Sequence, residues 1–280
     1  MPDFLICSDL DRTILPNGSQ PESKEARPLL RCLAARPEVC LVYVSGRSRQ
    51  LLQQAIADYD IPVPDYAVGD VGTTIYEPTR NWQHVSDWER EISRGWHPYH
   101  HGDLVDFLSD LAMLTIQEPE KQSQFKLSYY TDPEVDDTSL REEVLRRLSD
   151  KGVRASVIFS IDEKAEKGLV DILPENATKL EAIRFIQQKH RFPDRQMVFG
   201  GDSGNDLTVL TSGIQSVLVR NASENVRRTA VEIMTRKELQ GKLYLARGQF
   251  MGMNGNYSAG LLEGIVHFIP AAIEWLAHDS

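Results

Sequence analysis

The sequence predicts an α/β protein, with a doubly wound parallel sheet and a smaller α+β domain inserted into it. Two observations support this fold class. Short segments that are apolar throughout end abruptly at polar loops, as buried parallel strands do, and helix-like stretches separate them along the chain. In the middle of the chain, an alternating strand and charged amphipathic helices replace this pattern.

The apolar segments are expected to form the strands of the larger domain. They cover residues 4–7, 39–44, 196–199 and 215–219, and a further expected strand at 170–173 precedes Lys179. Helices are expected at residues 23–35, 48–59, 179–190 and 206–211. This order predicts a Rossmann-like core, in which ligands lie beyond the carboxyl ends of the strands.

The middle of the chain is expected to be a separate α+β domain. Helices are predicted at residues 104–114 and 139–151, and strands at 125–130 and 155–161. We expect this inserted domain to span residues 81–168, and the core to consist of residues 1–80 and 169–280.

Composition and charge exclude several classes of function. The 31 basic and 41 acidic residues give a net charge of −10 without a basic block, which disfavours nucleic-acid binding. An anionic substrate is still compatible with this charge, because a bound cation can reverse the local field. The three cysteines show no CxxC spacing, and the sequence contains no charged leader and no apolar run of about 18 residues. We therefore expect a cytoplasmic protein that does not bind membranes.

Asp9 and Asp11 follow the first predicted strand in the stretch Ser-Asp-Leu-Asp-Arg-Thr. In an extended backbone, two side chains separated by one residue project to the same side. Carboxylates held so close repel each other unless a cation lies between them or one is protonated, and both arrangements suit phosphoryl transfer. For this motif alone, an ordinary acidic turn is the alternative.

Asp202 and Asp206 follow another predicted strand, in Gly-Asp-Ser-Gly-Asn-Asp. Four residues apart across a glycine turn, they could reach one hard cation such as Mg²⁺, which prefers a few carboxylates together with water and phosphate oxygens. The alternative is a glycine-rich turn in which Asp206 caps the next helix.

Two further groups indicate a phosphate site. Ser45 and Gly46 lie at a strand end before a helix, where a hydroxyl and backbone N–H groups can hold phosphate. Lys179 opens a predicted helix and could neutralise phosphate charge. Taken singly, these residues also fit a Ser/Gly turn and a solvated lysine.

The order Asp-x-Asp-x-Thr, Ser, Lys, Asp-x-x-x-Asp resembles the four motifs of the haloacid dehalogenase superfamily. Five stretches and the tail at 257–268 are similar to bacterial sucrose-phosphate phosphatases: residues 8–13, 45–49, 125–130, 201–206 and 219–222. The insertion between Arg47 and Lys179 matches the position of the cap domain in that family. Leu180 departs from the glycine of many relatives, and Ser45 from their threonine.

The resemblance implies a mechanism through an aspartyl-phosphate. Asp9 is the expected nucleophile, and Asp11 the acid that protonates the leaving group and then the base that activates water. Mg²⁺ is expected between Asp9, Asp202 and the backbone carbonyl of Asp11. Asp206 orients a metal-bound water or joins the coordination sphere.

The resemblance also implies how the substrate is held. Ser45, the Gly46 N–H and Lys179 are expected to bind phosphate oxygens, and Arg47 and Asn205 to reach the sugar. Lys126 and Ser128, on the alternating strand of the cap, are candidate sugar contacts; a solvent-facing strand edge is the alternative for Ser128.

Sucrose 6-phosphate is the first expected substrate, followed by mannosylfructose phosphate and glucosylglycerol phosphate. A phosphomutase is a second hypothesis, with Arg146 and Arg147 as candidates for holding a second phosphate, and a receiver-like signalling domain is a third. Association with a glycosyltransferase, a sugar-phosphate synthase, is a further hypothesis. His97, His100 and His101 are expected to belong to a loop rather than to a zinc site, because no cysteine or carboxylate stands at ligand spacing.

Overall fold

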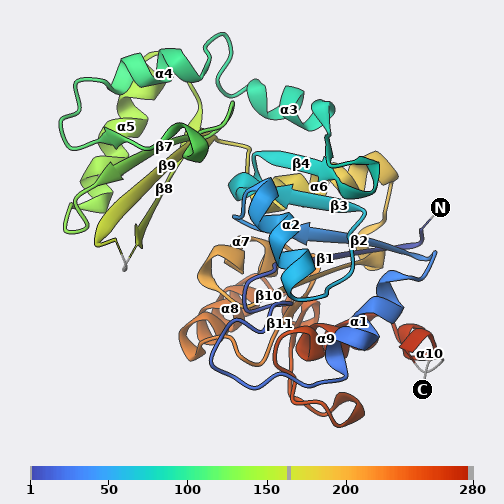
Figure 1. The fold of residues 1–280 in the computed structure, drawn as a ribbon. Helices are drawn as coiled ribbons and strands as arrows, with labels where there is room; N and C mark the ends of the chain where they lie inside the picture. Colours follow the sequence, from blue (N-terminus) through green and yellow to red (C-terminus); the bar gives the residue numbers. More distant parts are fainter. Residues whose placement is uncertain (1, 163–164, 277–280) are drawn as a thin grey trace. The chain divides into compact units, whose positions relative to one another are not determined.

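The computed structural model describes residues 2–162 and 165–276 of the chain. It contains two compact units (Figure 1). The larger unit combines Met1–His84 with Lys179–Ser280, and the smaller unit is Val85–Thr178. The smaller unit is therefore inserted between two segments of the larger one.

An eight-stranded sheet forms the centre of the larger unit, in the order β12-β11-β10-β1-β2-β3-β4-β5. Strand β4 pairs antiparallel with both β3 and β5, and the other neighbouring pairs are parallel. The strands are β1 (Phe4–Ser8), β2 (Val39–Val44), β3 (Tyr66–Gly69), β4 (Thr74–Glu77), β5 (Gln83–His84), β10 (Met197–Gly201), β11 (Gln215–Leu218) and β12 (Leu243–Leu245). Strand β1 lies between β2 and β10, so the carboxyl ends of these three strands meet at one edge of the sheet.

Helices cover both faces of this sheet, as expected for a doubly wound fold. One face packs against α1 (Ala26–Ala34), α2 (Arg49–Asp58), α9 (Ser258–Phe268) and α10 (Ala272–Leu276). The other face of the sheet contacts α7 (Leu207–Leu210) and α8 (Glu224–Arg236), and α6 (Lys179–His190) packs against α7.

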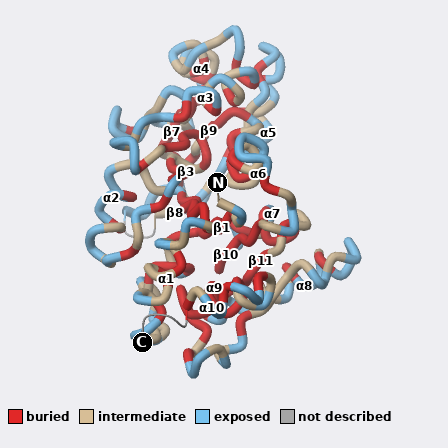
Figure 2. Tube along the Cα trace, turned by 90° about the vertical axis from the view of Figure 1, so that its right-hand side faces the viewer, coloured by how far each residue is buried: buried red, intermediate tan, exposed pale blue. Residues whose placement is uncertain are grey.

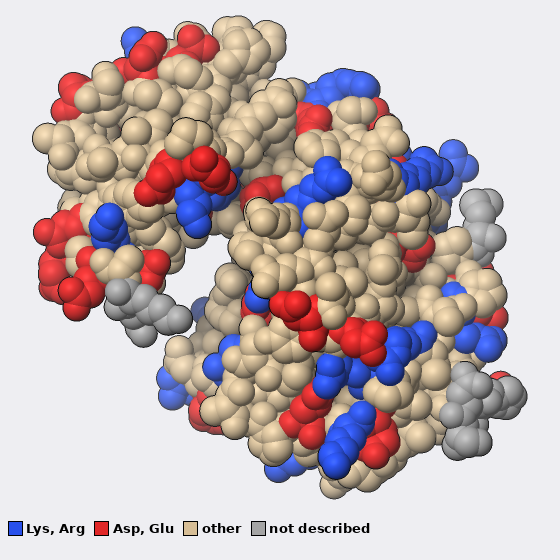
Figure 3. All heavy atoms as spheres, in the orientation of Figure 1, with Lys and Arg blue, Asp and Glu red and all other residues tan. Residues whose placement is uncertain are grey.

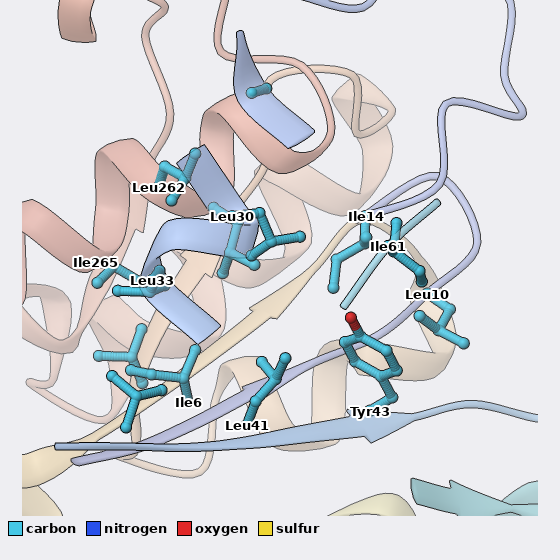
Figure 4. Packing of buried hydrophobic residues seen from close by; sticks show 14 of the residues in the cluster. Ile6, Leu10, Ile14, Leu30, Leu33, Leu41, Tyr43, Ile61, Leu262 and Ile265 are labelled. Carbon is cyan, nitrogen blue, oxygen red and sulfur yellow. The ribbon is translucent and has the colours of Figure 1, made fainter. Parts of the chain in front are cut away.

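The hydrophobic core of the larger unit lies between its sheet and α1, α2 and α9. Ile6, Leu41 and Tyr43 on the strands face Leu30 of α1 and Leu262 of α9 (Figure 4). The buried residues of α1 recur at helical spacing, which gives the helix one apolar face. Figure 2 shows the central strands as buried and much of α8 as exposed or intermediate.

The smaller unit is an antiparallel sheet with helices packed on it. Its strand order is β6-β7-β9-β8, and α4 and α5 contact β7 and β8. Its elements are α3 (Ser86–Ser93), α4 (His101–Leu108), β6 (Thr115–Ile116), β7 (Leu127–Thr131), α5 (Asp137–Asp150), β8 (Ala155–Asp162) and β9 (Lys167–Pro174). Asp136 caps α5 by accepting the N–H groups of Thr138 and Ser139.

The predicted fold class is confirmed, but one strand was assigned to the wrong sheet. Residues 170–173 belong to β9 of the smaller unit, so the second division between the units falls at 178/179 rather than 168/169, and the first at 84/85 rather than 80/81. The physical reason is alternation: Val170 and Ile172 are buried, whereas Asp171 projects to the opposite face. This pattern suits a half-buried antiparallel strand.

The predicted helix at 104–114 is also displaced. It begins at His101, because His100 and Asp103 form a capping box there, and it ends at Leu108, where hydrogen-bonded turns follow. Strands β3, β4, β5 and β12 were not predicted, since runs of two to four residues carry little periodic signal.

None of the described helices is long and apolar enough to cross a membrane. On the face drawn in Figure 3, acidic and basic side chains are interspersed.

Replacing Leu30 with alanine should lower the free energy of unfolding by about 2–5 kcal/mol, because the fully buried side chain would leave a cavity against the sheet. Urea denaturation measures this loss. The neighbouring Leu29→Ala change is the control: Leu29 is only half-buried, so its effect should be clearly smaller. Equal losses in the two variants would contradict this packing.

Candidate active site

The loop after β1 places Asp9 at the edge of the sheet. The Asp9 N–H donates to the Gly200 carbonyl of β10 at 2.9 Å, which holds the buried carboxylate against the end of that strand. Beyond it, the Leu10 carbonyl accepts the N–H groups of Ile14 and Leu15, so the chain turns back at once. Leu10, Ile14 and Leu15 are buried and anchor this turn in the core.

The loop after β10 brings Asp202 and Asp206 to the same edge. Asp206 Oδ2 accepts the N–H groups of Asp202 at 3.1 Å and Ser203 at 3.2 Å. This close turn requires glycine at position 201, because a Cβ there would lie 2.8 Å from Asp206 Cβ. Asp206 is thus fixed by backbone hydrogen bonds rather than by solvent.

Lys179 joins the two loops. It is the first residue of α6, and its Nζ donates to Asp9 Oδ1 at 2.7 Å, Asp206 Oδ1 at 2.8 Å and Asn205 Oδ1 at 3.1 Å. Burial lowers the pKa of Lys179, but Asp206 and Asp9 outweigh this and hold it above its usual value. The lysine is therefore a permanent positive charge between two buried carboxylates.

The carboxylates of Asp9, Asp202 and Asp206 could hold a metal ion. One oxygen from each lies within 4.8 Å of the others, and all three residues are buried. Lys179 and Arg12, which pairs with Asp202 at 3.1 Å, supply two positive charges against three negative ones. Oxygen donors with an excess of negative charge fit a hard divalent cation such as Mg²⁺.

The pKa values of these groups also favour a cation. Burial raises the pKa of Asp9 to about 7; Lys179 opposes this rise, and the charges of Asp206 and Asp202 add to it. Burial and Asp206 likewise raise the pKa of Asp202. A divalent cation would favour the ionised form of both carboxyls.

Asp11 lies in a different environment. Arg47 grips its carboxylate with two hydrogen bonds, Nε to Oδ2 at 2.9 Å and Nη2 to Oδ1 at 2.6 Å, and Asn17 Nδ2 donates to Oδ1 at 2.7 Å. Burial raises the pKa of Asp11, but the bonds and charge of Arg47 outweigh it, so the pKa is lowered. The Asp11 carboxylate is outside the metal-binding group, and coordination through its carbonyl stays a prediction.

These side chains line one cavity of about 680 Å³ within the larger unit. Asp9, Asp11 and Asp202 share it with Ser45, Gly46 and Arg47 from the end of β2. Ser45 is held by its N–H, which donates to the Val68 carbonyl of β3, and no atom lies within 4 Å of a Cβ placed on Gly46. The cavity thus combines three carboxylates, a hydroxyl and the backbone of Gly46, beside which there is open space.

A model of the sucrose-6F-phosphate phosphohydrolase family matches residues 2–269. The chain belongs to this family. The family and the sucrose-phosphatases of Nicotiana tabacum and Synechocystis to which the chain is similar are phosphoric monoester hydrolases, so the chain is a phosphatase.

Relatives agree on the family but differ in their named substrates. A protein of Nitrosococcus oceani, described only as a HAD-like hydrolase, is 52% identical over 98% of this chain and 74% of its own length. The mannosylfructose-phosphate phosphatase of Agrobacterium fabrum is 26% identical, over 79% of this chain and 84% of that protein. Sucrose-phosphatase 1 of Nicotiana tabacum is 28% identical, and the chain spans 51% of its length.

The crystal structure of the Synechocystis sucrose-phosphatase, in complex with sucrose and phosphate, superposes with a TM-score of 0.71. It is 26% identical, and the match covers 96% of this chain and 99% of that one.

The candidate sugar contacts of the smaller unit are held in an internal network. Ser128 is fully buried and donates to Asp171 Oδ1 at 2.5 Å, and Lys126 Nζ lies 3.4 Å from the same oxygen. Lys126 Nζ also donates to the Lys121 carbonyl, in the segment between β6 and β7, and the Ser128 hydroxyl lies 3.2 Å from the same oxygen. A sugar would therefore have to displace these partners, and the two contacts stay predictions.

Two other clusters from the sequence have structural partners. His100 caps α4, and His101 lies 3.3 Å from Gln122 Oε1; no metal-binding group that includes a histidine is found among residues 2–162 and 165–276. Arg146 pairs with Glu143 and Asp150, and Arg147 with Glu143 and Asp110.

Sequence reasoning missed a set of residues that supports the site. Arg12, with a left-handed φ of 60°, pairs with Asp202, and its carbonyl accepts Asn221 Nδ2 at 2.6 Å. Asn221 Oδ1 in turn accepts the N–H of Tyr257, another residue with positive φ. The resemblance at 219–222 marked this stretch, but only the fold shows that the Asn221 amide holds the loop after β1.

Binding of Mg²⁺ to the metal-free protein should release close to one proton at about pH 6 and much less at about pH 8. Below the Asp9 pKa of about 7 the cation must displace a proton, whereas above it the carboxylate is already ionised. Titration calorimetry in buffers of different ionisation enthalpy counts these protons. Asp9→Asn should lose most of the pH dependence, and equal release at both pH values in the unaltered protein would contradict the raised pKa.

Proposed function

We propose that the chain is a magnesium-dependent sugar-phosphate phosphatase that acts through an aspartyl-phosphate on Asp9, with sucrose 6-phosphate as its substrate. The observation that carries the proposal is the convergence of Asp9, Lys179, Asp202 and Asp206 at one edge of the sheet, in a chain of this family. The sugar is supported by the family and by the named ligands of the Synechocystis relative.

In the first half of the reaction, an Asp9 carboxylate oxygen attacks phosphorus as the bond from phosphorus to the sugar oxygen breaks. Asp11 donates a proton to the departing oxygen, giving a free sugar hydroxyl. Since Arg47 keeps Asp11 ionised in the structure, we expect substrate binding to loosen this pair before the proton is taken up.

In the second half, the Asp11 carboxylate takes a proton from water, and the water oxygen attacks phosphorus. The bond between phosphorus and Asp9 breaks, which frees inorganic phosphate and restores the Asp9 carboxylate. Arg47 suits this half, because it holds Asp11 in the basic form.

The residues around the phosphate position supply charge and orientation. Ser45, the Gly46 N–H and Lys179 would hold phosphate oxygens, and Arg47 and Asn205 line the side from which a sugar would enter. Mg²⁺, held by Asp9 and Asp202 with Asp206 beside them, would offset charge on the phosphate as a Lewis acid.

A disaccharide phosphate other than sucrose 6-phosphate is the second candidate. The Agrobacterium mannosylfructose-phosphate phosphatase aligns over 84% of its length, so its named substrate belongs in any test, together with glucosylglycerol phosphate. A phosphomutase is less supported, because the guanidinium groups of Arg146 and Arg147 are neutralised by Glu143, Asp150 and Asp110. Association with a sugar-phosphate synthase stays a prediction.

Asp9→Asn should reduce kcat by at least about 10³-fold while leaving the fold intact, because the amide cannot form the acyl phosphate. Phosphate release gives the rate, and circular dichroism checks the fold. Asp194→Asn is the matched control: this carboxylate pairs with Arg184 on the surface, and its loss should leave kcat unchanged. Turnover by Asp9→Asn would refute the nucleophile assignment, and full activity after removal of divalent cations would refute the metal.

A panel of phosphorylated mono- and disaccharides, assayed with Mg²⁺ over a range of concentrations, tests the substrate. We expect the highest kcat/KM for sucrose 6-phosphate, with free sugar and inorganic phosphate as products. A higher value for mannosylfructose phosphate or glucosylglycerol phosphate would replace the sugar but keep the reaction. An isomeric sugar phosphate as product would identify a mutase instead.

A further inference from the structure

The outer edge of β12 has backbone groups that no described strand pairs with. Strand β12 lies at the end of the large sheet, and β11 is its one neighbour among the described strands. Ala246 N–H donates to the Leu218 carbonyl of β11, and the direction of backbone groups alternates along a strand. The N–H and C=O groups of Leu243 and Leu245 therefore point away from β11, towards the open side of the sheet.

Two adjoining hollows, of about 440 and 190 Å³, follow this edge and share Gln240, Leu243 and Leu245. The larger one is also lined by Tyr244. Because successive side chains of a strand point to opposite faces, a hollow bounded by Leu243, Tyr244 and Leu245 together lies against the backbone edge itself. An added strand would occupy this position.

Helices α8 and α9 form the two walls of the edge. On α8, Arg227, Val231 and Met234 recur at helical spacing along the hollows, and Val231 is 39% exposed. From α9, His267 stacks on the Tyr244 ring with centroids 4.4 Å apart. Apolar side chains thus flank the free backbone groups on one face and an aromatic pair flanks them on the other.

The charge of this edge is opposite to that of the whole chain. Arg227 and Arg247 line the larger hollow, and none of the described residues that line it is a carboxylate, whereas the chain carries a net charge of −10. Arg247 is exposed and forms no ion pair with a described residue, and Arg227 lies 3.7 Å from Glu224, whose side chain is 85% exposed. The nearby Glu263 is buried, and its oxygens accept Tyr244 Oη and the N–H groups of Arg247 and Gly248.

We propose that this edge of β12 docks an extended acidic segment of a partner protein, which adds to the sheet as a further strand. The backbone groups of Leu243 and Leu245 would pair with it, and Arg227 and Arg247 would bind its carboxylates. A second copy of the chain fits less well, because two-fold pairing of this edge with itself would bring the arginines of both copies together. Nucleic acid would satisfy the arginines but would offer no strand to the exposed backbone groups.

A fluorescent seven-residue peptide that alternates glutamate with valine is the probe. Fluorescence anisotropy with the full chain at low salt should show saturable binding below about 1 mM. Arg227→Glu and Arg247→Glu should each weaken binding at least about tenfold. Arg228→Glu is the matched control, because Arg228 on α8 lies outside the hollows and hydrogen-bonds Asn225. This change should leave binding unchanged.

Further arms separate the alternatives. Peptide binding should protect the amides of Leu243 and Leu245 from hydrogen exchange, and a peptide with alternate backbone N-methyl groups should bind much more weakly. Phosphatase activity should be the same in all three arginine variants. The proposal is overturned if the peptide does not bind at about 1 mM, or if a lysine–valine peptide binds equally well. It is also overturned if Arg228→Glu loses as much binding as the other two variants. Competition from single-stranded DNA that leaves the amides of Leu243 and Leu245 unprotected would overturn it too.

Discussion

The larger unit depends on one electrostatic constraint: Asp9, Asp202 and Asp206 are buried together beside Lys179. Like charges so close, and out of water, are unfavourable unless positive charge and hydrogen bonds compensate them. Lys179 contributes ion pairs of 2.7 and 2.8 Å, Arg12 pairs with Asp202, and backbone N–H groups hold Asp206. The first turn of α6, the glycine at the end of β10 and the left-handed Arg12 all serve this arrangement.

Two aspartates separated by one residue are thereby given opposite properties. Asp9 lies among carboxylates in the interior and has a raised pKa, whereas Asp11 lies at the cavity wall with Arg47 and has a lowered one. In the proposed mechanism, Asp9 would hold the cation and attack phosphorus, whereas Asp11 would act as acid and base outside the metal site. The division of roles comes from the neighbours of each residue, since both are the same amino acid on the same loop.

The sequence was sufficient to predict the site where reactive polar residues follow the end of a strand. The segments at 4–7 and 39–44 are wholly apolar, and the segment at 196–199 is apolar after Gln196. Asp9, Ser45 and Asp202 follow these segments within three residues, so the edge that holds the site could be predicted from the pattern. The segment at 170–173 was misplaced because a short run with one aspartate fits either a buried parallel strand or a half-buried antiparallel one. Only pairing with β7 and β8 decides between these.

Other parts of the site depend on contacts between distant residues. Nothing local in the sequence shows that Arg47 hydrogen-bonds Asp11, 36 positions away, or that Asn221 hydrogen-bonds the Arg12 carbonyl, 209 positions away. The burial of Ser128 also depends on a contact that its own strand does not show. Alternation places Ser128 and Lys126 on the same side of the strand, but the segment that contains Lys121 covers Ser128.

The central place of β1 in the sheet has a consequence for how the protein is made. Its neighbour β2 follows within a few dozen residues, whereas β10 comes after the whole inserted unit. A chain emerging from the ribosome can therefore pair β1 on one side early, but its other edge stays open until Met197–Gly201 have been synthesised. The candidate site can therefore form only late in synthesis. The inserted unit, Val85–Thr178, is contiguous in sequence, so its internal contacts can form before β10 has been synthesised.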